Sequence, residues 1–208
     1  MKLSPALALL LLPLTLTTAC DKTAPTPPNY DSAINAYYQA HPTCLWENEK
    51  RFPVQADPDD AKIEGYDALV DQGLLTRAVT EKKIIIVSKR ENNYDLSDKG
   101  RTAWTADPNQ PGYGNFCFGH RKVATIDSSS PASNQPGSTV TVNYHYLLTA
   151  VPDWATAPET QTAFPQVRVV SAPMPGSATL TNTTQGWQVT GAISTASTPG
   201  PNDGKIVQ

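Results

Sequence analysis

The spacing of hydrophobic and polar positions predicts helices in the first half of the chain. Apolar residues at intervals of three and four predict one helix over residues 32–40, with Ile34, Tyr37 and Tyr38 on its buried face. A second helix is expected from Pro58, with Asp57 as its N-cap and Gly73 as its stop. Its apolar face is formed by Ile63, Tyr66, Leu69 and Val70.

Strands are expected from residue 83 onward. A run of isoleucine and valine over residues 83–87 predicts a strand, Glu91–Asn93 predicts a turn, and Tyr94 begins the returning strand. Ser97 is the expected N-cap of a short helix that ends near Trp104.

After a loop rich in Gly and Pro over residues 105–115, the pattern alternates with a period of two. Residues 116–126 and 139–148 are expected to pair as a long hairpin with one buried face. Shorter strands are expected further on, over residues 167–170, 178–181 and 187–189. From Gly191 onward, Ser, Thr, Pro and Gly predict a disordered tail.

One stretch of the first half resembles a known structural unit. The predicted helix ends in Gly73-Leu74-Leu75, and residues 94–101 (YDLSDKGR) follow the hairpin. This order resembles the winged helix of regulatory proteins over about residues 65–104. The resemblance implies a local winged-helix-like fold and not DNA binding, because acidic residues interleave with the basic ones.

The first residues have the features of an export signal. Lys2 gives a positive start, and residues 3–16 form an uncharged apolar run interrupted by two prolines. The run is too short to span a bilayer as a helix, which needs about 20 apolar residues. The alternatives that remain are a secreted protein and one held by lipid.

Residues 16–20 (LTTAC) resemble the lipobox of bacterial lipoproteins, although Thr17 stands where leucine is usual. The resemblance implies that Cys20 is lipidated and becomes the first residue of the mature protein. It also implies attachment to the cell membrane or outer membrane, with the folded part facing the periplasm. Residues 20–30 would then form a flexible tether.

Lipidation of Cys20 leaves Cys44 and Cys117 as an even pair in an oxidising compartment. We therefore predict a disulfide between them, which stabilises the fold by roughly 4 kcal/mol. The alternative is two buried free thiols. His120 lies close to Cys117 in sequence, but two ligands do not make a zinc site. No metal and no cofactor are expected.

The net charge of the chain limits the classes of partner that we expect. The chain has 16 basic and 19 acidic residues and a net charge of −3. The leader removes only Lys2, so the mature chain has a net charge of about −4. Nucleic acid is not an expected partner, because binding to phosphates needs clustered Lys and Arg. The expected partners are the membrane, through the lipid, and another envelope protein.

No linear motif for catalysis is found, whether a nucleophile elbow, a His-Glu-x-x-His zinc motif, a phosphate loop or a Cys-x-x-Cys pair. His120 and His145 are candidates to face each other across the hairpin and bind metal or sense pH, with two unrelated surface histidines as the alternative. The tryptophans, spread one per segment, are expected to anchor the core; they are Trp46, Trp104, Trp154 and Trp187.

The sequence as a whole predicts an α+β fold. A winged-helix-like half is expected over residues 31–112, an antiparallel β-hairpin-rich half over residues 113–190, and a tail over residues 191–208. The expected function is a non-enzymatic binding or structural module of the envelope, with no catalytic residue identified. The alternative is a small hydrolase or transferase, which a cluster of titratable side chains in one pocket would favour.

Overall fold

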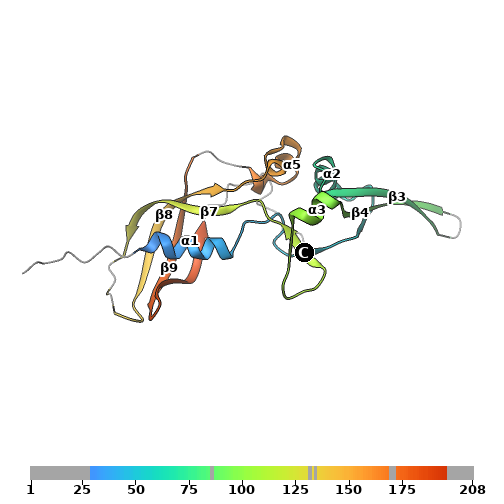
Figure 1. The fold of residues 1–208 in the computed structure, drawn as a ribbon. Coiled ribbons are helices and arrows are strands. Elements are labelled where there is room, and N and C mark those ends of the chain that lie inside the picture. Colours follow the sequence, from blue (N-terminus) through green and yellow to red (C-terminus); the bar gives the residue numbers. More distant parts are fainter. Residues whose placement is uncertain (1–28, 85–86, 131–132, 134, 169–171, 196–208) are drawn as a thin grey trace, which may run out of the picture.

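The computed structural model describes residues 29–84, 87–130, 133, 135–168 and 172–195. It combines helices with antiparallel sheets, so the α+β class is confirmed (Figure 1). The predicted export signal, Cys20, most of the expected tether and residues 196–208 lie outside the described residues.

One lobe is built on a four-stranded antiparallel sheet in the order β10-β9-β8-β7, with helix α1 packed against it (Figure 1). Its elements are α1 (Tyr30–Ala40), β7 (His120–Ser129), β8 (Thr139–Thr149), β9 (Met174–Thr183) and β10 (Gly186–Thr195). The alternation predicted over residues 139–148 is confirmed, because every second residue from Val140 to Tyr146 is buried. These side chains form one core with Tyr30, Ile34 and Tyr38 of α1.

The other lobe contains two three-stranded sheets, ordered β2-β4-β3 and β1-β6-β5. Its first elements are β1 (Lys50–Arg51), β2 (Val54–Ala56), α2 (Ile63–Asp71), β3 (Leu75–Ile84), β4 (Val87–Leu96), α3 (Asp98–Ala103), β5 (Trp104–Ala106) and β6 (Tyr113–Phe116). After β8 the chain returns to this lobe through α4 (Asp153–Thr156), α5 (Pro158–Ala163) and the 3-10 turn η1 (Pro165–Val167).

Several predicted boundaries differ from those in the structure. The second helix begins at Ile63 rather than Pro58, and Asp57 is not its N-cap. The carboxylate of Asp57 instead accepts a hydrogen bond from the Asp59 N–H and pairs with Lys89. The side chain of Asp57, which the sequence predicted to cap a helix, therefore forms an ion pair with Lys89 of β4.

The predicted turn at Glu91–Asn93 is wrong, because these residues lie inside β4 and pair with β3. Asn92 is 8 % exposed, and its amide donates to the Tyr94 hydroxyl, so a buried contact accommodates residues that favour turns. The short helix after Ser97 is confirmed, since the Ser97 hydroxyl accepts a hydrogen bond from the Gly100 N–H at 2.8 Å.

Later boundaries also shift. The strand predicted over residues 116–126 is divided between β6 and β7. The strand predicted over residues 167–170 is not formed at Val167, which ends the turn η1. Strand β10 continues to Thr195, beyond the expected start of the disordered tail at Gly191.

The disulfide lies where the chain passes between the two lobes. Cys44 and Cys117 are bonded, as predicted, with Cα atoms 3.8 Å apart. Around them, the N–H of Leu45 donates to Phe116 O at 3.0 Å, and the N–H of Phe118 donates to Thr43 O at 2.7 Å. The bond therefore ties the segment that leaves α1 to the segment that enters β7.

A buried pair of phenols joins α1 to the four-stranded sheet. The hydroxyls of Tyr38 and Tyr144 lie 2.6 Å apart, and neither side chain is more than 1 % exposed. Burial raises the pKa of both phenols above the ordinary value of 10.0. Both groups therefore keep their protons in the folded protein at pH values where an unfolded tyrosine ionises.

This pair predicts a loss of stability above about pH 10. Below that pH both phenols are neutral in both states; above it the unfolded chain releases protons that the folded chain retains. The free energy of unfolding then falls as pH rises, by about 1.4 kcal/mol per tyrosine per pH unit. Urea denaturation between pH 9 and pH 11.5 measures the slope, and Tyr38→Phe is expected to reduce it. An unchanged slope in Tyr38→Phe would contradict the assignment, whatever its effect at pH 7.

Candidate functional site

A pocket of about 400 Å³ lies where α2 meets the segment that follows α5. Its lining includes the rings of Trp46, Tyr66 and Phe164 and the charged side chains of Lys50 and Lys62. The volume lies within the range of small-molecule sites, which combine apolar walls with a few polar groups.

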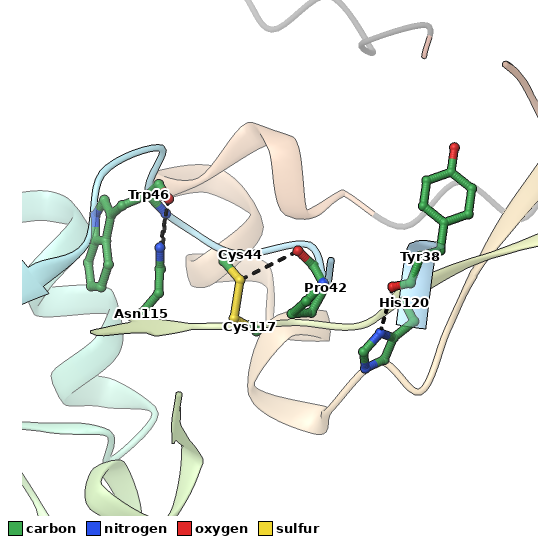
Figure 2. The surroundings of a disulfide bond; sticks show 7 residues. All are labelled: Tyr38, Pro42, Cys44, Trp46, Asn115, Cys117 and His120. Atoms are coloured by element: carbon green, nitrogen blue, oxygen red, sulfur yellow. Dashed lines mark hydrogen bonds between the residues drawn. A yellow bond between two sulfur atoms is a disulfide. The ribbon is translucent and has the colours of Figure 1, made fainter. Parts of the chain in front are cut away.

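Two hydrogen bonds to the backbone of Trp46 hold this residue in place. The side chain of Asn115, 7 % exposed, accepts from the Trp46 N–H at 3.2 Å and donates to the Trp46 carbonyl at 2.7 Å. Figure 2 shows this clamp beside the Cys44–Cys117 bond, on the same pair of strand-like segments. The disulfide and the amide clamp together hold one wall of the pocket in place.

Trp46 is also surrounded by rings. Five aromatic rings lie with their centroids 6.1 to 6.4 Å from that of Trp46. They belong to Phe52, Tyr66, Trp104, Phe116 and Phe164. Such packing restricts the tryptophan to one position, so its pocket-facing surface is preorganised.

Gly65 of α2 allows the ring of Phe164 to pack closely against the helix. A Cβ atom at this position would lie 2.9 Å from Cζ of Phe164, so any larger residue would displace the ring. Glycine inside a helix costs about 1 kcal/mol relative to alanine. The close contact between α2 and Phe164 explains why glycine is found there.

The pocket is lined by three charged side chains. Within the described part of the chain, no ion pair involves Lys50, Lys62 or Glu64, which all line the pocket. Two ammonium groups and one carboxylate therefore remain available to a bound molecule. Burial raises the pKa of Tyr66 above its ordinary value of 10.0, so its hydroxyl keeps its proton to a higher pH than an exposed tyrosine does.

An acidic hollow of about 410 Å³ adjoins the pocket along the seam between α2 and α5. Its carboxylates belong to Glu64, Asp67, Asp71 and Glu159. Two of them already have partners. Asp67 accepts from the Tyr94 hydroxyl at 2.7 Å and from Arg77 at 2.8 Å, and Glu159 accepts from Gln72.

The histidines do not form a shared site. Strand pairing places His120 opposite Thr149 and His145 opposite Thr125, so they do not face each other across the hairpin. The ring of His120 contacts the Tyr38 carbonyl at 3.1 Å, and that of His145 contacts Asp127 at 2.8 Å. Among the described residues, no group of three or more His, Cys, Asp or Glu is arranged to hold a metal ion.

The tryptophans lie in or against the two cores, as expected. Trp154 is 6 % exposed within the core of the lobe that contains α2 to α5, and Trp46 and Trp104 pack against this core. Trp187 packs against the other core, edge-on to Tyr30 at 5.2 Å. The sequence did not indicate that Trp46 also faces a pocket, because the opposite wall comes from residues 162–165.

Comparisons with known proteins give no relative from which a function can be transferred. No protein-family model matches the chain, and no curated protein or solved structure matches it. In the part of the chain that the structure covers, no helix is both long and apolar enough to cross a membrane.

Proposed function

We propose that this protein is a lipid-anchored envelope module that binds an apolar or aromatic anion in the pocket beside Trp46. The observation that carries the proposal is a fixed aromatic wall beside two lysines and one glutamate that have no ion-pair partner among the described residues, so the charges of the lining favour an anion. Rings supply contact area with little loss of freedom, and the ammonium groups attract a carboxylate, sulfonate or phosphate.

Two of the four carboxylates in the adjoining hollow favour binding over catalysis. Asp67 and Glu159 are hydrogen-bonded to groups of the protein itself, which is typical of structural acids. A hydrolase or transferase would need such groups directed at a substrate.

The winged-helix-like interpretation of residues 65–104 is part of the same proposal, as a scaffold and not as a DNA reader. It is supported by the order of α2, the β3–β4 hairpin and α3. The basic groups of this unit are largely paired with acids: Arg77 with Asp67, Lys89 with Asp57, Arg90 with Glu81 and Arg101 with Asp98. Paired bases are poorly placed to neutralise phosphates.

Anchoring is tested by Cys20→Ser, which removes the thiol that would carry the lipid. The variant is expected to leave the detergent phase almost completely in phase separation, because a protein without its acyl chains has little affinity for membranes. Lys122→Gln serves as the control, since it changes an exposed residue of β7 without touching the anchor or the disulfide. Partitioning of Cys20→Ser with membranes would contradict the lipid assignment.

The pocket is tested with two related dyes, anilinonaphthalene sulfonate, which is an aromatic anion, and its neutral analogue phenylnaphthylamine. Lys50→Gln and Lys62→Gln are each expected to weaken binding of the anion by about threefold to fivefold, since an exposed ion pair contributes up to about 1 kcal/mol. Binding of the neutral dye should not change, and Lys122→Gln on β7 should affect neither dye. Equal affinity for the anion in all variants would refute the proposed ligand class.

A further inference from the structure

We propose that two copies of this protein associate through the free edge of β3, as an antiparallel pair centred on Val79. This contact is separate from the pocket and does not depend on its ligand. It would join the two β3–β4 hairpins into a continuous four-stranded ribbon, related by a twofold axis.

The edge is open in the single chain. Strand β3 lies at the edge of its sheet, and all residues from Thr76 to Glu81 are exposed. Val79 is a large aliphatic residue with 61 % of its surface exposed. Strand β2 covers β4 only at residues 92–94, so the outer part of the hairpin has two strands alone and extends away from the lobe (Figure 1). An isolated two-stranded ribbon is marginally stable in water, so a further strand would stabilise it.

Hydrogen bonding shows which backbone groups face the open edge. The Ser97 N–H donates to the Leu74 carbonyl at 3.1 Å, and the register pairs Leu75 with Leu96. Leu74 and Ser97 are therefore a hydrogen-bonded pair. Such pairs alternate along an antiparallel ladder, so the N–H and C=O groups of Arg77, Val79 and Glu81 point away from β4. These three residues can bond a neighbouring strand without breaking the hairpin.

The charges along the edge match those of a second copy. Antiparallel pairing centred on Val79 places the two Val79 side chains together and puts Arg77 of each copy opposite Glu81 of the other. Arg77 also holds Asp67 of its own chain through Nη1, and Glu81 lies 4.0 Å from Arg90, but their side chains stay 43 % and 61 % exposed, so both can reach a second partner. No like charges meet over residues 77–81. This symmetry is what a twofold self-contact requires, because one surface must be its own complement. The occupant we infer is therefore a second copy.

The test uses the full lipidated chain with Val79→Cys, oxidised in its membrane and run on a non-reducing gel. Directly opposite residues in a hydrogen-bonded pair have Cα atoms about 5.5 Å apart, within the range of a disulfide. We expect a reducible dimer whose bond maps to position 79. Lys122→Cys, on the exposed edge strand β7, is the matched control and should give little dimer.

Two additional variants separate pairing from chance collision. Adding Glu81→Lys to Val79→Cys places like charges opposite each other twice and should reduce the dimer by about tenfold. Two controls should not reduce it: Glu47→Lys makes the same change of charge elsewhere, and Arg90→Gln removes the partner of Glu81 within the hairpin. Val79→Pro removes only an N–H that faces the open edge, so the fold should remain while the full-length protein no longer crosslinks with a lysine-reactive reagent. A yield from Val79→Cys no higher than that of Lys122→Cys, or one unaffected by Glu81→Lys, would overturn the proposal.

Discussion

Replacing both bonded cysteines, Cys44→Ala with Cys117→Ala, is expected to lower the free energy of unfolding by about 4 kcal/mol. The bond closes a loop with a sequence separation of 73, and an open loop of that length has much more freedom in the unfolded chain. The loss should appear as a lower urea midpoint, followed by tryptophan fluorescence.

Reduction of the unaltered protein is the control for this prediction. It opens the same loop but keeps both sulfur atoms, so a similar loss of stability in the two experiments would identify loop closure as the cause. Because Trp46 and its clamp Asn115 lie beside the bond, dye binding in the pocket is also expected to weaken on reduction (Figure 2). A change in unfolding free energy below about 1 kcal/mol would contradict the loop-closure account.

Gly100→Ala is expected to destabilise the lobe that contains α2 and α3 by about 3 kcal/mol. A Cβ atom at this position would lie 1.8 Å from the carbonyl oxygen of Leu74. That oxygen is backbone and accepts the Ser97 N–H, so it cannot move without breaking the contact between the start of β3 and the cap of α3. Thermal unfolding measures the effect.

Gly186→Ala is the matched control, because Gly186 has a φ of +98° and no atom would lie within 4 Å of an added Cβ. Its cost is backbone conformation alone, about 1 kcal/mol. If Gly100→Ala were no more destabilising than Gly186→Ala, the steric contact with Leu74 would not be the reason for glycine at position 100.

The sequence by itself determined the features that depend on neighbouring residues. The alternation along β8, the apolar face of α1 and the cap at Ser97 are set by backbone periodicity and by hydrogen bonds over a few residues. The disulfide was also predictable, because Cys44 and Cys117 are the pair left over once Cys20 is assigned to lipid.

Only the tertiary structure decided where these elements pack and where a ligand has room. Asp57 forms an ion pair with Lys89 and does not cap the helix that was predicted to start beside it. Asn92 lies within a strand, where its side-chain amide donates to the Tyr94 hydroxyl inside the protein. The pocket is lined by both Trp46 and Phe164, which are far apart in the sequence. Helix α1 likewise packs on the sheet of β7 to β10, which comes much later in the chain. Contacts between residues so distant in sequence leave no local pattern, because they depend on which surfaces exclude water together when the chain folds.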